Sequence, residues 1–188
     1  MINSIKFRFT PLVALAAAVT ASAQVVNDSS LQVTTIASGL TTPISAVFLG
    51  PDDLLVSEKA TGKVKRIKSG IPTEVLDLAV NSASERGMLG MVLHPDFPAN
   101  PSVYIYWSES STGADTVDAA AIGLRGNRLD RFIWNGSNLV FSNTLWTNRA
   151  LQTDAGQPVR GNHNGGVIRF GHDKKLYLII GDTGRRGW

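Results

Sequence analysis

The feature that most constrains this chain is a unit that occurs three times: an apolar run, a turn with an aspartate, and a second apolar run. The turns contain Asp52, Asp96 and Asp173. Aspartate suits such a turn because its carboxylate can accept a hydrogen bond from the backbone two residues further on. The spacing from Asp52 to Asp96 is 44 residues, which matches one four-stranded propeller blade of about 40–50 residues. The longer spacing to Asp173 indicates a unit with an insertion.

Each of the first two units also contains a second pair of strands. Residues 63–67 and 74–76 form the first pair, and residues 128–134 and 139–141 form the second pair across Asn135-Gly136, a strong hairpin signal. Residues 108–126 are a polar insert. Inner strands packed on both faces should be apolar, and outer strands should alternate. The pattern therefore predicts an all-β partial propeller with about two and a half blades, with a β-sandwich as the alternative.

A propeller closes with about four to eight blades, so this number of strands predicts the front part of a longer protein or a gene product cut short. The strand edges at both ends would then be open, and we expect poor solubility for that reason.

The N-terminus has the features of a secretory signal peptide. Lys6 and Arg8 precede the short apolar run 12–19, and Ala21-Ser22-Ala23 provides a cleavage site. We predict a signal peptide over residues 1–23, cleavage after Ala23, a mature domain over residues 24–188, and secretion or a periplasmic location. A buried N-terminal helix is the alternative. The apolar run is shorter than the ~20 residues that a membrane span needs, so we expect no membrane anchor.

The composition and motifs of the chain exclude several classes of protein and of binding site. The chain has no cysteine, so neither disulfides nor a lipid-anchored cysteine is expected. Its formal net charge is +3 with both signs scattered, which does not support a nucleic-acid partner. No histidine or acidic pair has zinc-ligand spacing, so we predict no metal ligand in this chain. Dinucleotide-binding and hydrolase-elbow glycine motifs are also absent.

One histidine has the setting of a proton acceptor. His163 lies in the glycine-rich segment 161–166, before a predicted hairpin. An imidazole is well suited to proton transfer near neutral pH, and glycines permit close approach of a flat cofactor. A loop histidine that bonds a neighbouring backbone group remains an alternative. His94, His172 and the repeat aspartates are interpreted as turn residues; Asp182 is interpreted likewise, or as facing a central channel.

Three stretches resemble the soluble glucose/sorbosone dehydrogenase family, six-bladed propellers that use pyrroloquinoline quinone (PQQ). They are residues 39–58, residues 85–97 with Gly-Met-Leu-Gly and His-Pro-Asp-Phe, and residues 162–185 with Asn-His-Asn-Gly-Gly and Gly-Asp-Thr-Gly-Arg. Their order and spacing make the match specific and cover most of the mature chain. The resemblance implies a partial six-bladed β-propeller.

The resemblance also implies roles for individual residues. His163 matches the histidine that takes the hydroxyl proton while hydride passes to PQQ. Glu85 lies where the family has a glutamine that touches cofactor and substrate, and Asn162 where one branch has an aspartate beside the catalytic histidine. Arg185 matches a family arginine at the cofactor. Gly187 and Trp188 lie where that branch places a glutamine and a leucine near the sugar. The Trp188 ring could stack on a substrate instead.

The implied function is a PQQ-dependent oxidoreductase that oxidises an aldose sugar or related alcohol and passes electrons to an external acceptor. The calcium ligands and most of the basic residues that hold the quinone are expected in later blades. We therefore expect little quinone binding by the 188-residue chain itself. The alternatives are a non-catalytic propeller that serves as a binding module and a calcium-dependent, lactonase-like hydrolase.

Overall fold

The computed structural model describes residues 26–151 and 158–184, so the predicted signal peptide lies outside the described residues. The chain divides into two units, residues 1–34 and 35–188. In the first unit, Asp28 accepts hydrogen bonds from the backbone amide and the hydroxyl of Ser30, at 2.9 and 2.7 Å. All the strands belong to the second unit. Among the described residues, no helix has the length and apolar character needed to cross a membrane.

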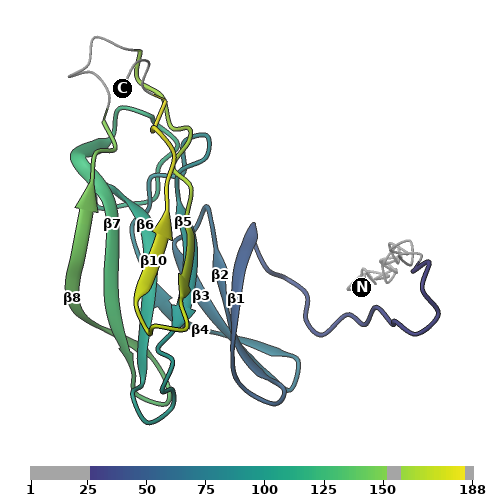
Figure 1. The fold of residues 1–188 in the computed structure, drawn as a ribbon. Coiled ribbons are helices and arrows are strands. Elements are labelled where there is room, and N and C mark those ends of the chain that lie inside the picture. Colours follow the sequence, from purple (N-terminus) through teal and green to yellow (C-terminus); the bar gives the residue numbers. More distant parts are fainter. Residues whose placement is uncertain (1–25, 152–157, 185–188) are drawn as a thin grey trace, which may run out of the picture. The chain divides into compact units, whose positions relative to one another are not determined.

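Three antiparallel sheets follow one another along the described chain, and in each one the strands pair in chain order (Figure 1). The first sheet consists of β1 (Pro43–Gly50), β2 (Asp53–Glu58), β3 (Lys63–Lys68) and β4 (Ile71–Asp77). The second consists of β5 (Met88–Leu93), β6 (Ser102–Ser110), β7 (Ile122–Trp134) and β8 (Leu139–Asn148). The third pairs β9 (Val167–Phe170) with β10 (Leu176–Ile179).

The first strands of the three sheets are neighbours: β5 contacts β1 on one side and β9 on the other. Separate meandering sheets whose first strands meet are the arrangement of propeller blades around an axis. The predicted all-β partial propeller is therefore confirmed, with two four-stranded blades and the first strand pair of a third in the part of the chain described here.

The core lies between the sheets. The larger cluster joins the first two blades, and the smaller one joins the second blade to β9 and β10. The first cluster includes Leu55, Val64, Met91, Ile105 and Phe132. The second includes Tyr106, Leu129 and Ile168. Burying one such side chain fully stabilises a fold by about 1.5–3 kcal/mol, so these contacts hold neighbouring blades together.

The apolar inner strands are not all packed on both faces, because β1, β9 and β10 each leave apolar side chains exposed. Phe48 of β1 is 69% exposed and Ile179 of β10 is 64% exposed. A blade is covered on both faces only when it has a neighbour on each side. Within the described residues, the main contacts of the first and third sheets with another sheet are to the second blade. Their outer faces consequently leave apolar side chains in solvent.

The loops differ from the prediction in one place and agree with it in two. The expected insert 108–126 is shorter, because β6 and β7 continue to pair up to Ser110 and Ile122. The predicted hairpin at Asn135 forms, with the carboxamide oxygen of Asn135 accepting the amide of Asn138 at 2.8 Å. In the third unit, Asp173 accepts the amide of Lys175 at 3.0 Å, as the turn chemistry predicts.

Candidate functional site

His163 lies in the irregular segment that leads into β9, and two carboxylates hold it. Its backbone amide donates to Oε2 of Glu85 at 2.5 Å, and its Nδ1 lies 2.6 Å from Oδ1 of Asp182. Its carbonyl accepts the amide of Gly181 at 3.0 Å. The residue has a φ of 59°, a left-handed conformation that is uncommon for a residue with a side chain. Glu85 and Gly181 thus fix the backbone from both sides, and Asp182 fixes the ring.

The imidazole remains accessible although it is held. The His163 side chain is 52% exposed and that of Asp182 is 39% exposed. Since Asp182 occupies Nδ1, the ring nitrogen left for another partner is Nε2. An oriented, half-exposed imidazole with one free nitrogen is the arrangement expected of a general base.

Asp182 is the functional candidate that the sequence analysis did not select. The hydrogen bond from His163, helped by the amide of Gly184 at 2.8 Å, lowers the pKa of the Asp182 carboxyl. The carboxylate is therefore ionised over the neutral range and can accept a hydrogen bond from the Nδ1–H group. Its position two residues after the apolar run 176–180 was the available signal, since residues at the end of an inner strand can face the channel.

Glu85 lies at the end of the loop before β5, and its main contact is to the backbone of His163. Its own amide donates to the carbonyl of Gly161 at 2.8 Å. The neighbouring Lys59 donates from Nζ to the carbonyl of Ser84 at 2.8 Å. Burial lowers the pKa of Lys59, and the nearby Glu85 carboxylate partly opposes that effect. Glu85 therefore joins the second blade to the segment carrying the histidine.

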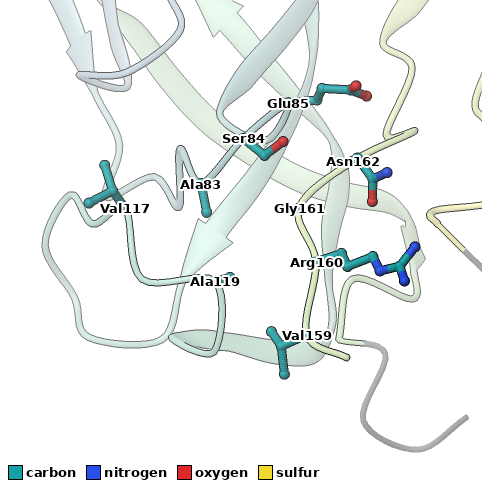
Figure 2. A pocket seen from close by; sticks show the side chains of 9 residues that line it. All are labelled: Ala83, Ser84, Glu85, Val117, Ala119, Val159, Arg160, Gly161 and Asn162. Atoms are coloured by element: carbon teal, nitrogen blue, oxygen red, sulfur yellow. The ribbon is translucent and has the colours of Figure 1, made fainter. Parts of the chain in front are cut away.

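Asn162 lines a hollow of about 500 Å³ beside the histidine segment. Figure 2 shows Ser84 and Glu85 facing the segment 159–162, with Val117 and Ala119 on a third stretch of chain. The side-chain oxygen of Asn162 is buried and has no hydrogen-bond partner among the described atoms. The structure thus places the predicted residues Glu85, Asn162 and His163 together.

A network of buried side-chain amides holds the segment that carries His163 against the second blade. Asn164 is buried and donates to the carbonyl of Gly161 at 2.9 Å. Its side-chain oxygen accepts from Asn127 of β7 at 3.0 Å, and Asn127 in turn accepts the hydroxyl of Ser108 at 2.7 Å. Fully satisfied buried networks of this kind make a local conformation rigid.

The glycines around His163 are closely packed against neighbouring protein segments. A Cβ on Gly165 would lie 2.3 Å from the carbonyl oxygen of Ile179, and one on Gly166 would lie 2.5 Å from Cβ of Leu89. One on Gly181 would lie 2.6 Å from the carbonyl oxygen of His163. Glycine is required at these positions because neighbouring protein segments approach them closely. Close approach of a flat cofactor to this segment stays a prediction.

The remaining predicted site residues divide into two groups. Arg185 and Trp188, like Gly187, lie outside the described residues. His94 has the structural role predicted: its Nδ1 accepts the amide of Asp96 at 3.1 Å, and its ring packs on Phe170 with centroids 5.6 Å apart. Within residues 26–151 and 158–184, no group of three or more acidic or histidine side chains is placed to hold a metal ion.

Comparison with known proteins identifies sugar dehydrogenases among the relatives of this chain. The family model described as Glucose / Sorbosone dehydrogenase matches residues 40–187. Quinoprotein glucose dehydrogenase B from Acinetobacter calcoaceticus is 33% identical over 159 residues, which are 80% of this chain and 30% of that protein.

Solved structures agree with this. An oxidoreductase described as a glucose dehydrogenase from Thermus thermophilus has a TM-score of 0.65 at 28% identity, covering 80% of this chain and 41% of its own. The PQQ-bound aldose sugar dehydrogenase from Streptomyces coelicolor has a TM-score of 0.63 at 29% identity, covering 81% and 41%. The chain thus spans well under half the length of these relatives. It belongs to the glucose/sorbosone dehydrogenase family.

Proposed function

We propose that this chain contributes the proton-accepting side of the active site in a PQQ-dependent dehydrogenase that oxidises an aldose sugar or a related alcohol. The family membership and the PQQ-bound relative support the reaction class. The observation that carries the assignment to particular residues is the 2.6 Å contact between Nδ1 of His163 and Asp182.

In this proposal, each residue near His163 has a distinct task. Asp182 accepts a hydrogen bond from the Nδ1–H group and so keeps the lone pair of Nε2 free, the arrangement found when a carboxylate orients a catalytic imidazole. Nε2 takes the hydroxyl proton of the substrate, which makes hydride loss from the same carbon easier. Glu85 holds the backbone of the base. Asn162 offers an amide to a substrate hydroxyl.

The described residues fit the substrate side of a quinone site. When bound, PQQ would accept the hydride as a two-electron oxidant. Its carboxylates need arginine or lysine partners, whereas the side chains that bond His163 directly are the acidic Glu85 and Asp182. Arg160 is the basic residue that lines the neighbouring hollow in the described part of the chain. We therefore propose Arg185 as the contact of this chain to the cofactor and Trp188 as a contact to the substrate. We propose further basic residues and the calcium ligands on later blades.

The test is His163→Ala in the longest natural polypeptide that contains this chain, loaded with PQQ and calcium. Loss of a general base should lower sugar-dependent dye reduction by about 10²–10⁴-fold. The matched control is His172→Ala, which removes an imidazole from the turn between β9 and β10 and should leave turnover unchanged. Unchanged turnover in His163→Ala would remove this residue from the mechanism. Lactone hydrolysis without quinone would favour the hydrolase alternative.

We also propose export through the predicted signal peptide. N-terminal sequencing of protein recovered outside the cytoplasm should begin at Gln24. Retention of Met1 in the mature protein would contradict this.

A further inference from the structure

Arg86, which follows Glu85, is the largest side chain that is completely buried, among the described residues, with an exposed fraction of 0%. Its charged group has no carboxylate partner in the described parts of the chain; it bonds to backbone carbonyls. Nη1 donates to the carbonyl of Ala119 at 2.7 Å, and Nη2 donates to the carbonyls of Ala150 and Arg160, the latter at 2.5 Å. Burial lowers the pKa of this guanidinium, but arginine remains charged in proteins.

The three carbonyls belong to three different stretches of chain. Ala119 is in the loop between β6 and β7, Ala150 follows β8, and Arg160 is in the irregular segment that carries the histidine. Two of the three, Ala119 and Arg160, also line the hollow beside Asn162 (Figure 2). The guanidinium therefore connects the walls of the candidate site.

The side chain of Arg86 acts together with Glu85. Glu85 bonds the carbonyl of Gly161 and the amide of His163, and Arg86 bonds the carbonyl of Arg160. Two consecutive residues of the second blade thus fix residues 160, 161 and 163 in succession. Residues 158–166 belong to no strand, so these contacts replace the ladder hydrogen bonds that position other segments.

We propose that Arg86 is a positioning residue for His163, acting through the segment 158–163 that its guanidinium holds against the second blade. The inference rests on the proposed role of His163 as the base. Arginine suits the task because its planar group presents several donors at fixed angles. A lysine ammonium keeps the charge but cannot reproduce that fork, and the freed carbonyls would be left unsatisfied.

The experiment compares Arg86→Lys with Arg66→Lys. Arg66 lies on β3, an outer strand of the first blade, and is a matched control. Its guanidinium also donates two hydrogen bonds, to the carboxylate of Asp53 in β2 at 2.7 and 2.5 Å. Hydrogen–deuterium exchange is measured by mass spectrometry on peptides that cover residues 158–166. We expect at least about tenfold faster exchange there in Arg86→Lys, with other peptides unchanged, and no change there in Arg66→Lys.

A kinetic measurement on the loaded protein gives the second readout. Displacement of a catalytic group by about 1 Å can lower turnover by about 10²-fold, so kcat should fall by about that factor in Arg86→Lys while KM changes less than about threefold. Added methylguanidinium should restore part of the activity of Arg86→Gly. Unchanged exchange in residues 158–166, or equally faster exchange throughout the chain, would overturn the positioning role.

The exchange result separates this inference from the proposed function. If His163→Ala kept full turnover, the proposed function would fail, and exchange would still decide whether Arg86 holds the segment. If His163→Ala lost turnover and Arg86→Lys changed neither exchange nor kcat, only the role of Arg86 would be wrong.

Discussion

At the scale of single residues, the pair formed by His163 and Asp182 determines what the site can do. Asp182 bonds both the imidazole and the amide of Gly184, so the carboxylate is itself held in place. The ring it orients is half exposed. Orientation by a fixed carboxylate with access at the other nitrogen distinguishes His163 from His94, whose ring packs against aromatic side chains.

Asp182→Asn tests this orientation. A carboxamide can donate to Nδ1 as well as accept from it, so the ring can adopt the tautomer that has a proton on Nε2. We expect kcat to fall by about 10²–10⁴-fold, as when the carboxylate of a triad is replaced, measured as dye reduction by the PQQ-loaded protein.

Asp173→Asn is the control, because it makes the same exchange in a turn where the carboxylate bonds Lys175 and Tyr177. Equal activity of Asp182→Asn and the unmodified protein would show that Asp182 has no part in orienting the base.

The sequence predicted the base but not its partner. His163 is conspicuous because its neighbours in the segment 161–166 are all glycines and asparagines, and Glu85 and Asn162 were selected through the family resemblance. Asp182 has the same local appearance as the turn aspartates at 52, 96 and 173. Which way such a side chain points depends on the packing of β9 and β10 against the second blade, and a local pattern does not contain that information.

At the scale of elements, the contact between β5 and the segment before β9 is made backbone to backbone. A Cβ on Gly90 would lie 1.9 Å from the carbonyl oxygen of Gly166. No side-chain rotation can relieve such an overlap, because the obstructing atom belongs to the main chain. The absence of a side chain at Gly90 therefore sets how closely the second and third sheets approach.

Gly90→Ala should separate these two elements. We expect a loss of about 1–3 kcal/mol in the free energy of unfolding, the usual effect of overpacking, measured by urea denaturation. Gly123→Ala in β7 is the matched control, since a Cβ there would meet nothing within 4 Å. A Gly90→Ala protein as stable as the Gly123→Ala protein would mean that the two sheets can shift apart without a penalty.

The strands were predictable because two periodicities coincide in this chain: apolar runs within each strand and a repeat of whole blades. The ends of the strands β6 and β7 in the second blade were not predictable in this way. Ser110 pairs with Ile122, although the polar residues between 108 and 126 suggested a loop. β6 and β7 are the two central strands of this sheet, and their pairing continues where backbone hydrogen bonds can be satisfied, whether or not the side chains are apolar.

At the scale of the whole molecule, ion pairs make stability depend on pH in a defined direction. The hydrogen bond from Arg66 lowers the pKa of Asp53, that from Lys63 lowers the pKa of Glu74, and that from His163 lowers the pKa of Asp182. A carboxyl whose pKa is lower in the folded state stabilises that state above its unfolded value and loses the contribution as the pH falls.

We therefore expect a melting temperature that is level above about pH 5 and falls below about pH 4, where unfolded carboxyls titrate, as followed by circular dichroism. Asp53→Asn should melt lower at neutral pH and decline less steeply in acid, because it lacks one of these groups. A melting temperature that stayed constant down to about pH 3, below the unfolded carboxyl values, would contradict this account.

The bond between Glu85 and the amide of His163 joins residues 78 positions apart. Closing so large a loop has an entropic penalty that must be met before the contact can form, and such distant pairings set the pace of folding. Each sheet can form its hairpins early, whereas Glu85 fixes the backbone of the base only when the second and third sheets meet. Recovery of proton-transfer ability during refolding would then report when the second and third sheets assemble, and it should come later than the appearance of strand structure.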